Sequence, residues 1–118
     1  WLRRSQATAY CGSLLERFQI RSAGAVSNAM ALSGGNRQRL SVARALAGTP
    51  AVLVAHDACR GLDLRAAALV HRMIREFAAA GGAVLLISSD LDELIALSVS
   101  LAVICRGRLH ALLHGFSE

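Results

Sequence analysis

The spacing of apolar side chains changes along the chain, and the changes predict helices and strands in turn. In residues 1–20, 36–47 and 64–80, apolar residues recur three and four positions apart, which predicts amphipathic helices. Glycine follows the last two segments at once, and glycine favours the end of a helix. We therefore expect three helices, the first separated from the second by a loop of small and polar residues over 21–31.

Continuous apolar runs lie between these helices. Residues 51–56 (AVLVAH) and 83–89 (AVLLISS) are typical of short strands that are buried on both faces. Residues 101–113 predict a hairpin that turns at Arg106-Gly107. Strand and helix alternate, so we expect an α/β fold with a parallel sheet, helices packed on it and a C-terminal β-hairpin.

Two further local features follow from the same pattern. Asp90 precedes a short apolar segment, and Glu93 three positions later predicts a capping box at the start of a short helix. The two longer helices each carry a stripe that should face the core. The expected inward residues are Leu40, Val42, Ala43, Leu46 and Ala47 in the first and Leu69, Met73, Ile74 and Phe77 in the second.

Composition narrows the class of partner. The chain has 118 residues and a formal charge of +5, and all 13 of its basic residues are arginine. This charge favours a partner with phosphates or an acidic surface, although a solvated basic surface is an equal alternative. The arginine-rich segment 36–48 lacks neighbouring aromatic residues, which disfavours single-stranded nucleic acid. No apolar stretch approaches the roughly 18 residues that a membrane span needs, so we expect a soluble or peripheral protein.

Cysteine and histidine patterns predict no metal site. The three cysteines lie far apart and form no Cys/His metal spacing, so we expect reduced thiols in a cytosolic compartment. His71 falls on a predicted helix, and His110 and His114 fall near the C-terminus. None of the three has a metal-ligand neighbour at a useful spacing, and we expect surface histidines or histidines paired inside the protein.

The most informative polar segment is Ser33-Gly34-Gly35-Asn36, at the start of the second predicted helix. Glycines let backbone N–H groups approach an anion, and the positive end of the helix adds to the attraction. The Ser33 hydroxyl and the Asn36 amide can each donate a further hydrogen bond to a phosphate. The alternative is an ordinary helix N-cap, which this short segment alone would favour.

The longer string ALSGGNRQRLSVARAL, residues 31–46, resembles the signature motif of ATP-binding cassette (ABC) proteins. Its Asn36 is similar to the LSGGNQQK variant of cassettes that energise uptake of simple sugars and nucleosides, and the resemblance covers nearly all of residues 14–110. It implies a partial P-loop NTPase-like fold. It also implies that Ser33, Gly34, Gly35 and Asn36 contact the γ-phosphate of ATP held by a partner cassette.

The segment VLVAHDACRGLD, residues 52–63, resembles the family's catalytic strand and the turn after it. His56 then stands at the Mg²⁺-linked aspartate position and Asp57 at the catalytic glutamate position. Imidazole is a poor ligand for Mg²⁺, and Asp57 is one methylene shorter than glutamate. In a second register Asp57 is the metal-linked residue and Ala58 replaces the base. In a third interpretation Asp57 only ends the strand. Ala58 and Cys59 also replace the family's usual Pro-Thr.

Two more positions match the family. Ser89, in LLISSDLDEL, stands at the switch-histidine position, where it can form hydrogen bonds but cannot take up charge near neutral pH. Its Ser-Ser-Asp sequence resembles the second cassette of tandem sugar or nucleoside importers. Asp63 matches the aspartate at the interface between cassettes, although it could also cap the helix that starts at residue 64.

Other parts of the family's pattern are not found. The chain contains no lysine, so it lacks the lysine of the phosphate-binding loop, and residues 1–31 hold neither the adenine-stacking aromatic nor the glutamine loop. The resemblance thus implies that residues 1–31 end a helical subdomain and that residues 32–118 are the C-terminal half of a nucleotide-binding domain. Alone, such a chain should expose apolar strand edges and hydrolyse no ATP.

The resemblance also implies partners. These are an N-terminal cassette half, a second nucleotide-binding cassette that shares ATP and Mg²⁺, and transmembrane permease subunits at the cytoplasmic face of the plasma membrane. No specific nucleic acid is expected. The alternative function is a non-catalytic or regulatory relic that binds no nucleotide, and a basic nucleic-acid-binding module is a weaker one.

Overall fold

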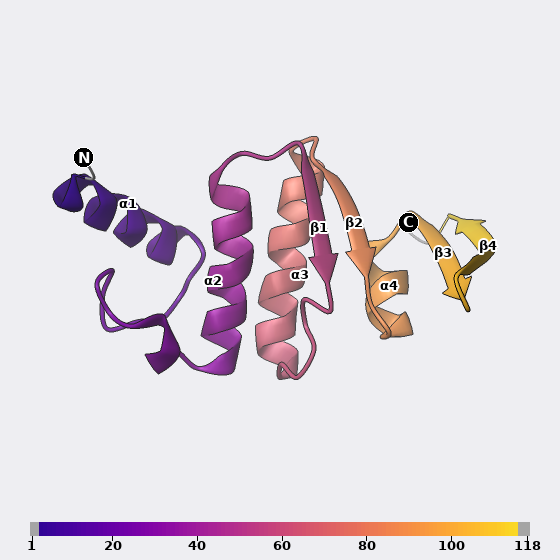
Figure 1. Ribbon diagram of the computed structural model, residues 1–118, viewed down its shortest axis with the longest axis horizontal. Coiled ribbons are helices and arrows are strands. Elements are labelled where there is room, and N and C mark those ends of the chain that lie inside the picture. The colour runs from indigo at the N-terminus through magenta and orange to yellow at the C-terminus, as the bar shows by residue number, and fades with distance from the viewer. Residues whose placement is uncertain (1–2, 116–118) are drawn as a thin grey trace.

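The computed structural model describes residues 3–115 and has an α/β architecture, in agreement with the sequence pattern (Figure 1). Helices and strands alternate through the middle of the chain, and a hairpin follows. In chain order the elements are α1 (Arg4–Arg17), a 3₁₀ turn η1 (Ala29–Ala31), α2 (Gly34–Ala47), β1 (Val52–His56), α3 (Leu64–Ala79), β2 (Ala83–Ile87), α4 (Leu91–Leu97), β3 (Ser100–Cys105) and β4 (Arg108–His114).

The two apolar runs form a parallel pair. β1 and β2 are hydrogen-bonded in register, with Val52 opposite Ala83 and His56 opposite Ile87. The connection between them runs through α3, as parallel strands require. Figure 1 shows α2 and α3 side by side on the same side of these strands. The carboxyl ends of β1 and β2 therefore lie at one edge of the sheet, and the segments that follow each strand leave from that edge.

The core lies between α2, α3 and the sheet. Val70 of α3 is completely buried at its centre, and α3 also contributes Met73 and Ile74. Leu69 and Phe77, which were expected to face inward, are only half-buried and line a cavity of about 440 Å³ beside α1. The buried apolar cluster consists of Ile20, Leu32, Val42, Ala43, Leu53, Ala55, Ala58, Val70, Met73 and Ile74.

The expectation that both strands are buried on both faces is wrong. In β1, Leu53 and Ala55 are buried, but Val52 and Val54 are 57% and 60% exposed. In β2, Leu85 and Ile87 are 54% and 45% exposed. The helices cover one face, and no element among residues 3–115 buries these side chains on the other. A continuous apolar run records that both faces are apolar, but it does not show that the same chain covers both.

This bare sheet face gives a first testable prediction. Replacing Val54 and Leu85 by threonine should leave the free energy of unfolding nearly unchanged, because both side chains are more than half exposed and threonine favours strands. The double variant should self-associate less than the unaltered chain, since the apolar patch is smaller. Sedimentation velocity over a range of concentrations measures the effect. Equal self-association in both proteins would show that this face is not the cause.

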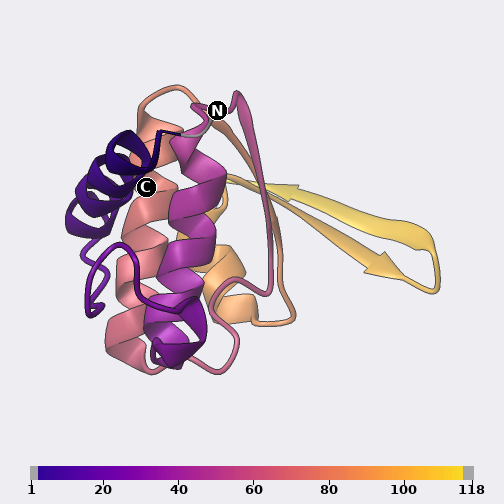
Figure 2. The ribbon, with the colours of Figure 1, turned by 60° about the vertical axis from the view of Figure 1, so that its left-hand side comes forward.

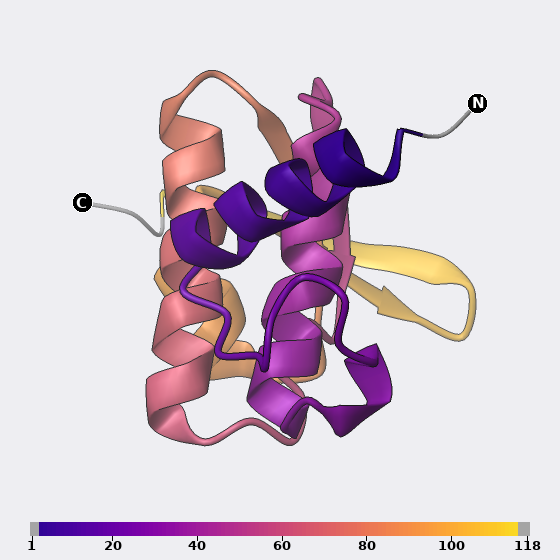
Figure 3. The ribbon, with the colours of Figure 1, turned by 90° about the vertical axis from the view of Figure 1, so that its left-hand side faces the viewer.

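The packing of α1 differs from the prediction. α1 is a helix as expected, but it buries no residue along its length. Tyr10 on α1 is half-exposed and donates a hydrogen bond from its hydroxyl to the carbonyl oxygen of Ala47, at 3.2 Å. Leu2 falls outside the described residues. Figure 3 shows α1 lying across α2 and α3, so it is a cover for these helices and not part of the core.

The predicted C-terminal hairpin is confirmed. β3 and β4 pair antiparallel, with a shift of register between Val103 and Ile104. Arg106 and Gly107 both have positive φ, 50° and 73°, as the tight turns that join antiparallel strands require. In Figure 2 the hairpin projects away from the helices. None of the helices within residues 3–115 combines the length and the apolar character of a membrane-spanning helix.

Candidate functional site

The start of α2 is the first candidate site. The helix begins at Gly34, two residues earlier than expected, because Ser33 is its N-cap. The Ser33 hydroxyl oxygen accepts hydrogen bonds from the backbone N–H of Asn36, at 3.4 Å, and from the Asn36 side-chain amide, at 3.0 Å. The N-cap interpretation of Ser33 is therefore confirmed. The first backbone N–H groups of any helix have no hydrogen-bond acceptor within the helix. In α2 they lie at an end where Ser33 and Gly34 are exposed.

Asn36 is buried, which the sequence pattern did not predict. Its side-chain carbonyl oxygen Oδ1 accepts the backbone N–H of Arg21, at 3.1 Å, while its amide nitrogen serves Ser33. The side chain thus ties the loop before residue 28 to the start of α2. Contact of Asn36 with a phosphate stays a prediction, and its observed contacts hold Ser33 in place.

The two glycines at the start of α2 have different surroundings. A Cβ atom added at Gly35 would lie 3.0 Å from the Cβ of Ala66 in α3, whereas one added at Gly34 would meet nothing within 4 Å. The missing side chain at Gly35 therefore lets the start of α2 approach the start of α3. Asp63 caps α3 with its Oδ1 accepting the Ala66 N–H at 2.8 Å, which confirms its expected local role.

This close approach can be tested by placing a leucine at each glycine. Gly35→Leu should lower the free energy of unfolding by about 2 kcal/mol, because overpacking at a tight contact typically costs that much. Gly34→Leu is the matched control on the same turn, and it should cost less because its Cβ points into open space. Urea denaturation followed by circular dichroism measures both. Equal losses would mean that the contact with Ala66 is not limiting.

Ser33 and Asp63 line one hollow of about 1150 Å³, between the end of α1, the following loop and α3. Arg39, on the wall of this hollow, donates from Nε to the carbonyl oxygen of Gly35, at 3.3 Å, and from Nη1 to that of Gln19. The charged residues of the hollow are Glu16, Arg21, Arg39, Asp63, Arg65 and Arg72. Arginines outnumber carboxylates, so the hollow favours anions.

The second candidate site lies at the carboxyl end of β1. His56 ends the strand with its side chain 71% exposed, and Asp57 follows in a left-handed conformation, with φ of 47°. The backbone N–H of Asp57 donates to the carbonyl oxygen of Ile87, at 2.8 Å. Its carboxylate oxygen Oδ2 lies 3.5 Å from Nη1 of Arg60 and 3.8 Å from Nε2 of His56.

These groups do not fit the Mg²⁺ ion that the family resemblance implies. Mg²⁺ prefers carboxylate and water oxygens in octahedral geometry. His56 offers an imidazole, and the carboxylate of Asp57 already faces the guanidinium of Arg60. Ser89 is exposed just beyond β2, at the same edge of the sheet as Asp57. The catalytic correspondences of Asp57 and Ser89 stay predictions.

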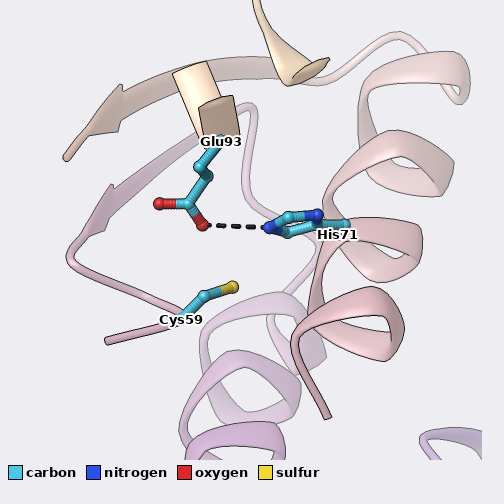
Figure 4. A group of neighbouring side chains, drawn as sticks. All are labelled: Cys59, His71 and Glu93. Atoms are coloured by element: carbon cyan, nitrogen blue, oxygen red, sulfur yellow. Dashed lines mark hydrogen bonds and ion pairs between the residues drawn. The ribbon is translucent and has the colours of Figure 1, made fainter. Parts of the chain in front are cut away.

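A third group of side chains was missed by the sequence pattern. Cys59, His71 and Glu93 converge from the turn after β1, from α3 and from α4, and one ligand atom from each lies within 4.8 Å of the others (Figure 4). Nε2 of His71 is 3.1 Å from Oε1 of Glu93. His71 is therefore paired inside the protein with a residue distant in sequence, and His110 and His114 are exposed, which are the two environments expected for these histidines.

The contact between Glu93 and His71 also changes the N-cap of α4. Asp90 accepts the backbone N–H groups of Asp92 and Glu93, as a cap should. In the expected capping box Glu93 would accept the N–H of Asp90, but that N–H donates to the hydroxyl of Ser88 instead, at 3.0 Å. Half of the capping box is thus absent, because the buried Glu93 carboxylate turns inward to His71.

The pKa values of Cys59 and Glu93 shift in opposite directions. Burial, hydrogen bonding to Glu93 and the negative charges of Glu93 and Asp90 raise the pKa of Cys59 to about 12. Burial also raises the pKa of Glu93, but hydrogen bonds with Ser88, Cys59 and His71 and the charge of His71 outweigh it. The net effect lowers the pKa of Glu93, so its carboxylate stays ionised within the cluster.

Topology could have revealed this cluster, but local spacing could not. His71 follows Cys59 by 12 positions and Glu93 follows His71 by 22, which matches no metal-binding motif. Cys59 comes shortly after β1 and Glu93 shortly after β2. Because parallel strands share one carboxyl edge, the segments that follow them become neighbours.

Comparison with known proteins adds evidence from relatives. No family model matches the chain. A ribose import ATP-binding protein from Rhizobium etli is 40% identical over 93 residues, which is 79% of this chain and 18% of the relative. A guanosine import ATP-binding protein from Bacillus subtilis is 40% identical over 99 residues, 84% of this chain and 19% of the relative. The chain spans about a fifth of the length of these curated relatives.

Solved structures show the fold. An ATP-binding cassette of an ABC transporter superposes with a TM-score of 0.81 at 24% identity, covering 98% of this chain and 46% of that one. The dimeric, post-hydrolysis structure of a second cassette, bound to ADP and phosphate, gives a TM-score of 0.80 at 18% identity, covering 97% and 49%.

Proposed function

Since the chain belongs to the family of ABC import ATP-binding proteins, we propose that it is the signature-bearing part of one nucleotide-binding cassette in a sugar or nucleoside importer. The observation that carries this proposal is the exposed start of α2, where Ser33 caps a 14-residue helix directly before two glycines. Such an end attracts a phosphate group through its free N–H groups and the helix dipole.

In this proposal, the phosphate belongs to ATP that a partner cassette holds. Ser33 and the backbone N–H groups of Gly34 and Gly35 meet its γ-phosphate, and Asn36 keeps Ser33 in position. Asp63 lies on the same hollow, where it faces the partner across the interface. The arginines around the hollow favour the negatively charged ligand.

The edge of the sheet near β1 and β2 is then not a hydrolytic centre. Asp57 faces Arg60, and neither His56 nor Ser89 replaces the carboxylate and the histidine of the family pattern. ATP hydrolysis and Mg²⁺ binding occur at the partner's site. The bare sheet face of Val52, Val54, Leu85 and Ile87 receives the N-terminal part of the cassette. The assembly acts beside permease subunits at the cytoplasmic side of the membrane.

Association in the presence of nucleotide tests this function. The chain is mixed with an intact cassette that has its own phosphate-binding loop, with EDTA present so that ATP persists, and complex formation is followed by sedimentation velocity. We expect a complex with ATP and none with ADP, since only ATP supplies the γ-phosphate. If no complex forms at any ATP concentration, the proposal is wrong. Binding of duplex DNA that is insensitive to ATP would favour the basic module instead.

A further inference from the structure

Cys59, His71 and Glu93 bring a thiol, an imidazole and a carboxylate together inside the protein. We propose that these three side chains form a zinc site, with water as the fourth ligand. The inference is independent of the proposed function, because it concerns side chains other than those at the start of α2 and needs no nucleotide. Cys59 also departs from the family resemblance, which has threonine at this position, so the site comes from this chain's own residues.

The geometry is close to that of a tetrahedral site. With Zn–S of about 2.3 Å and Zn–N or Zn–O of about 2.0–2.1 Å, neighbouring ligand atoms lie roughly 3.3–3.7 Å apart. Nε2 of His71 and Oε1 of Glu93 are already 3.1 Å apart, and the whole group lies within 4.8 Å. In Figure 4 the Cys59 sulfur and the Glu93 carboxylate both point toward the His71 ring. Small side-chain rotations bring all three atoms onto one ion.

The three donor atoms, sulfur, nitrogen and oxygen, favour Zn²⁺ over Mg²⁺ and Ca²⁺. A thiolate and an imidazole are ligands that Zn²⁺ accepts readily, whereas Mg²⁺ and Ca²⁺ require oxygen. When the thiol loses its proton to the metal, the thiolate and the Glu93 carboxylate together balance the charge of Zn²⁺. This balance matters because only 5% of the Glu93 side chain is exposed and a buried net charge is costly.

The arginines next to His71 in the sequence do not compete for Glu93, and Cys59 Sγ has only a long contact, of 4.0 Å, with the carbonyl oxygen of Ala67. Arg75 donates to the carbonyl oxygen of Ala96, at 3.2 Å, and Arg72 faces Glu76, at 3.7 Å, so both α3 arginines nearest to His71 have partners outside the cluster. Asp90 adds negative charge near Cys59 while it caps α4. Cys59 and His71 are only half-buried, which provides a route for the ion and for a water ligand.

A zinc ion there would have a structural role. It would tie the turn after β1 to both α3 and α4, and that turn runs from Asp57 to Asp63. Metal binding should therefore stabilise the fold by an amount that depends on free zinc, since only the folded chain brings the three ligands together.

Cobalt provides a direct test, because Co²⁺ occupies tetrahedral zinc sites and a coordinated thiolate gives it a charge-transfer absorption band. The experiment uses the Cys11→Ser, Cys105→Ser variant of the full chain, in which Cys59 is the remaining cysteine and both replaced residues are exposed. We expect one Co²⁺ per chain, a thiolate-to-cobalt band, and its loss when one equivalent of Zn²⁺ is added. Absence of the band in this variant overturns the proposal.

Ligand variants then identify the site. Adding Cys59→Ser should abolish the band, and His71→Gln should weaken Co²⁺ and Zn²⁺ binding, whereas the matched control His110→Gln in the hairpin should not. Circular dichroism checks that each variant is folded. A second readout needs no ligand substitution, since Zn²⁺ should slow alkylation of Cys59 in the two-serine variant. Unchanged alkylation, or metal binding that survives Cys59→Ser and His71→Gln in folded protein, would overturn the assignment.

Discussion

Replacing Ser33 by aspartate should abolish ATP-dependent association with a partner cassette while leaving the chain as stable as before. Aspartate caps helices as well as serine does, and it also interacts favourably with the positive end of the helix. Its carboxylate would lie where the γ-phosphate is proposed to bind, however, and like charges in contact cost several kcal/mol, or roughly 100-fold or more in affinity. Sedimentation velocity with ATP and urea denaturation measure the two effects separately.

Ser33→Asn is the matched control, because asparagine has nearly the shape and capping ability of aspartate without the charge. The asparagine variant should keep most of the association and the stability of the unaltered chain. If the aspartate variant associates as well as the asparagine variant, the start of α2 does not meet a phosphate. If both variants lose stability, the hydrogen bonds to Asn36 depend on the serine hydroxyl itself.

Replacing Ile74 by alanine should lower the free energy of unfolding by about 3 kcal/mol. Ile74 is 3% exposed in the cluster that joins α3 to α2 and the sheet, and truncation of such a side chain typically costs about 2–5 kcal/mol. This is a large share of the roughly 5–15 kcal/mol that stabilises a typical domain. Urea denaturation followed by circular dichroism gives the change directly.

Leu64→Ala on the same helix is the control for this measurement. Leu64 is the first residue of α3 and is 92% exposed, so its truncation should change the free energy of unfolding by less than about 0.5 kcal/mol. Both residues are large and aliphatic and stand in one predicted helix. Comparable losses at the two positions would show that Ile74 does not contribute more to the packing of α3 than Leu64 does.

Much of the local structure followed from the sequence. Helix and strand order, the capping roles of Ser33, Asp63 and Asp90 and the hairpin turn at Arg106-Gly107 depend on interactions within a few residues. Residue spacing and the conformational preferences of neighbouring residues are enough to predict them. The signature string likewise identified the family and the one helix start proposed to meet a phosphate.

Contacts between segments distant in the sequence could be identified only from the tertiary structure. The sequence suggested that Gly35 meets an anion, and only the fold shows that its missing side chain makes room for Ala66. The apolar runs did not show that one sheet face stays bare, because a pattern records the polarity of a face and not the presence of a covering layer. The meeting of Cys59, His71 and Glu93 depends on two parallel strands that end at one edge. Pairing across such separations is decided only when the whole chain packs, and the proposed zinc site exists only in the folded protein.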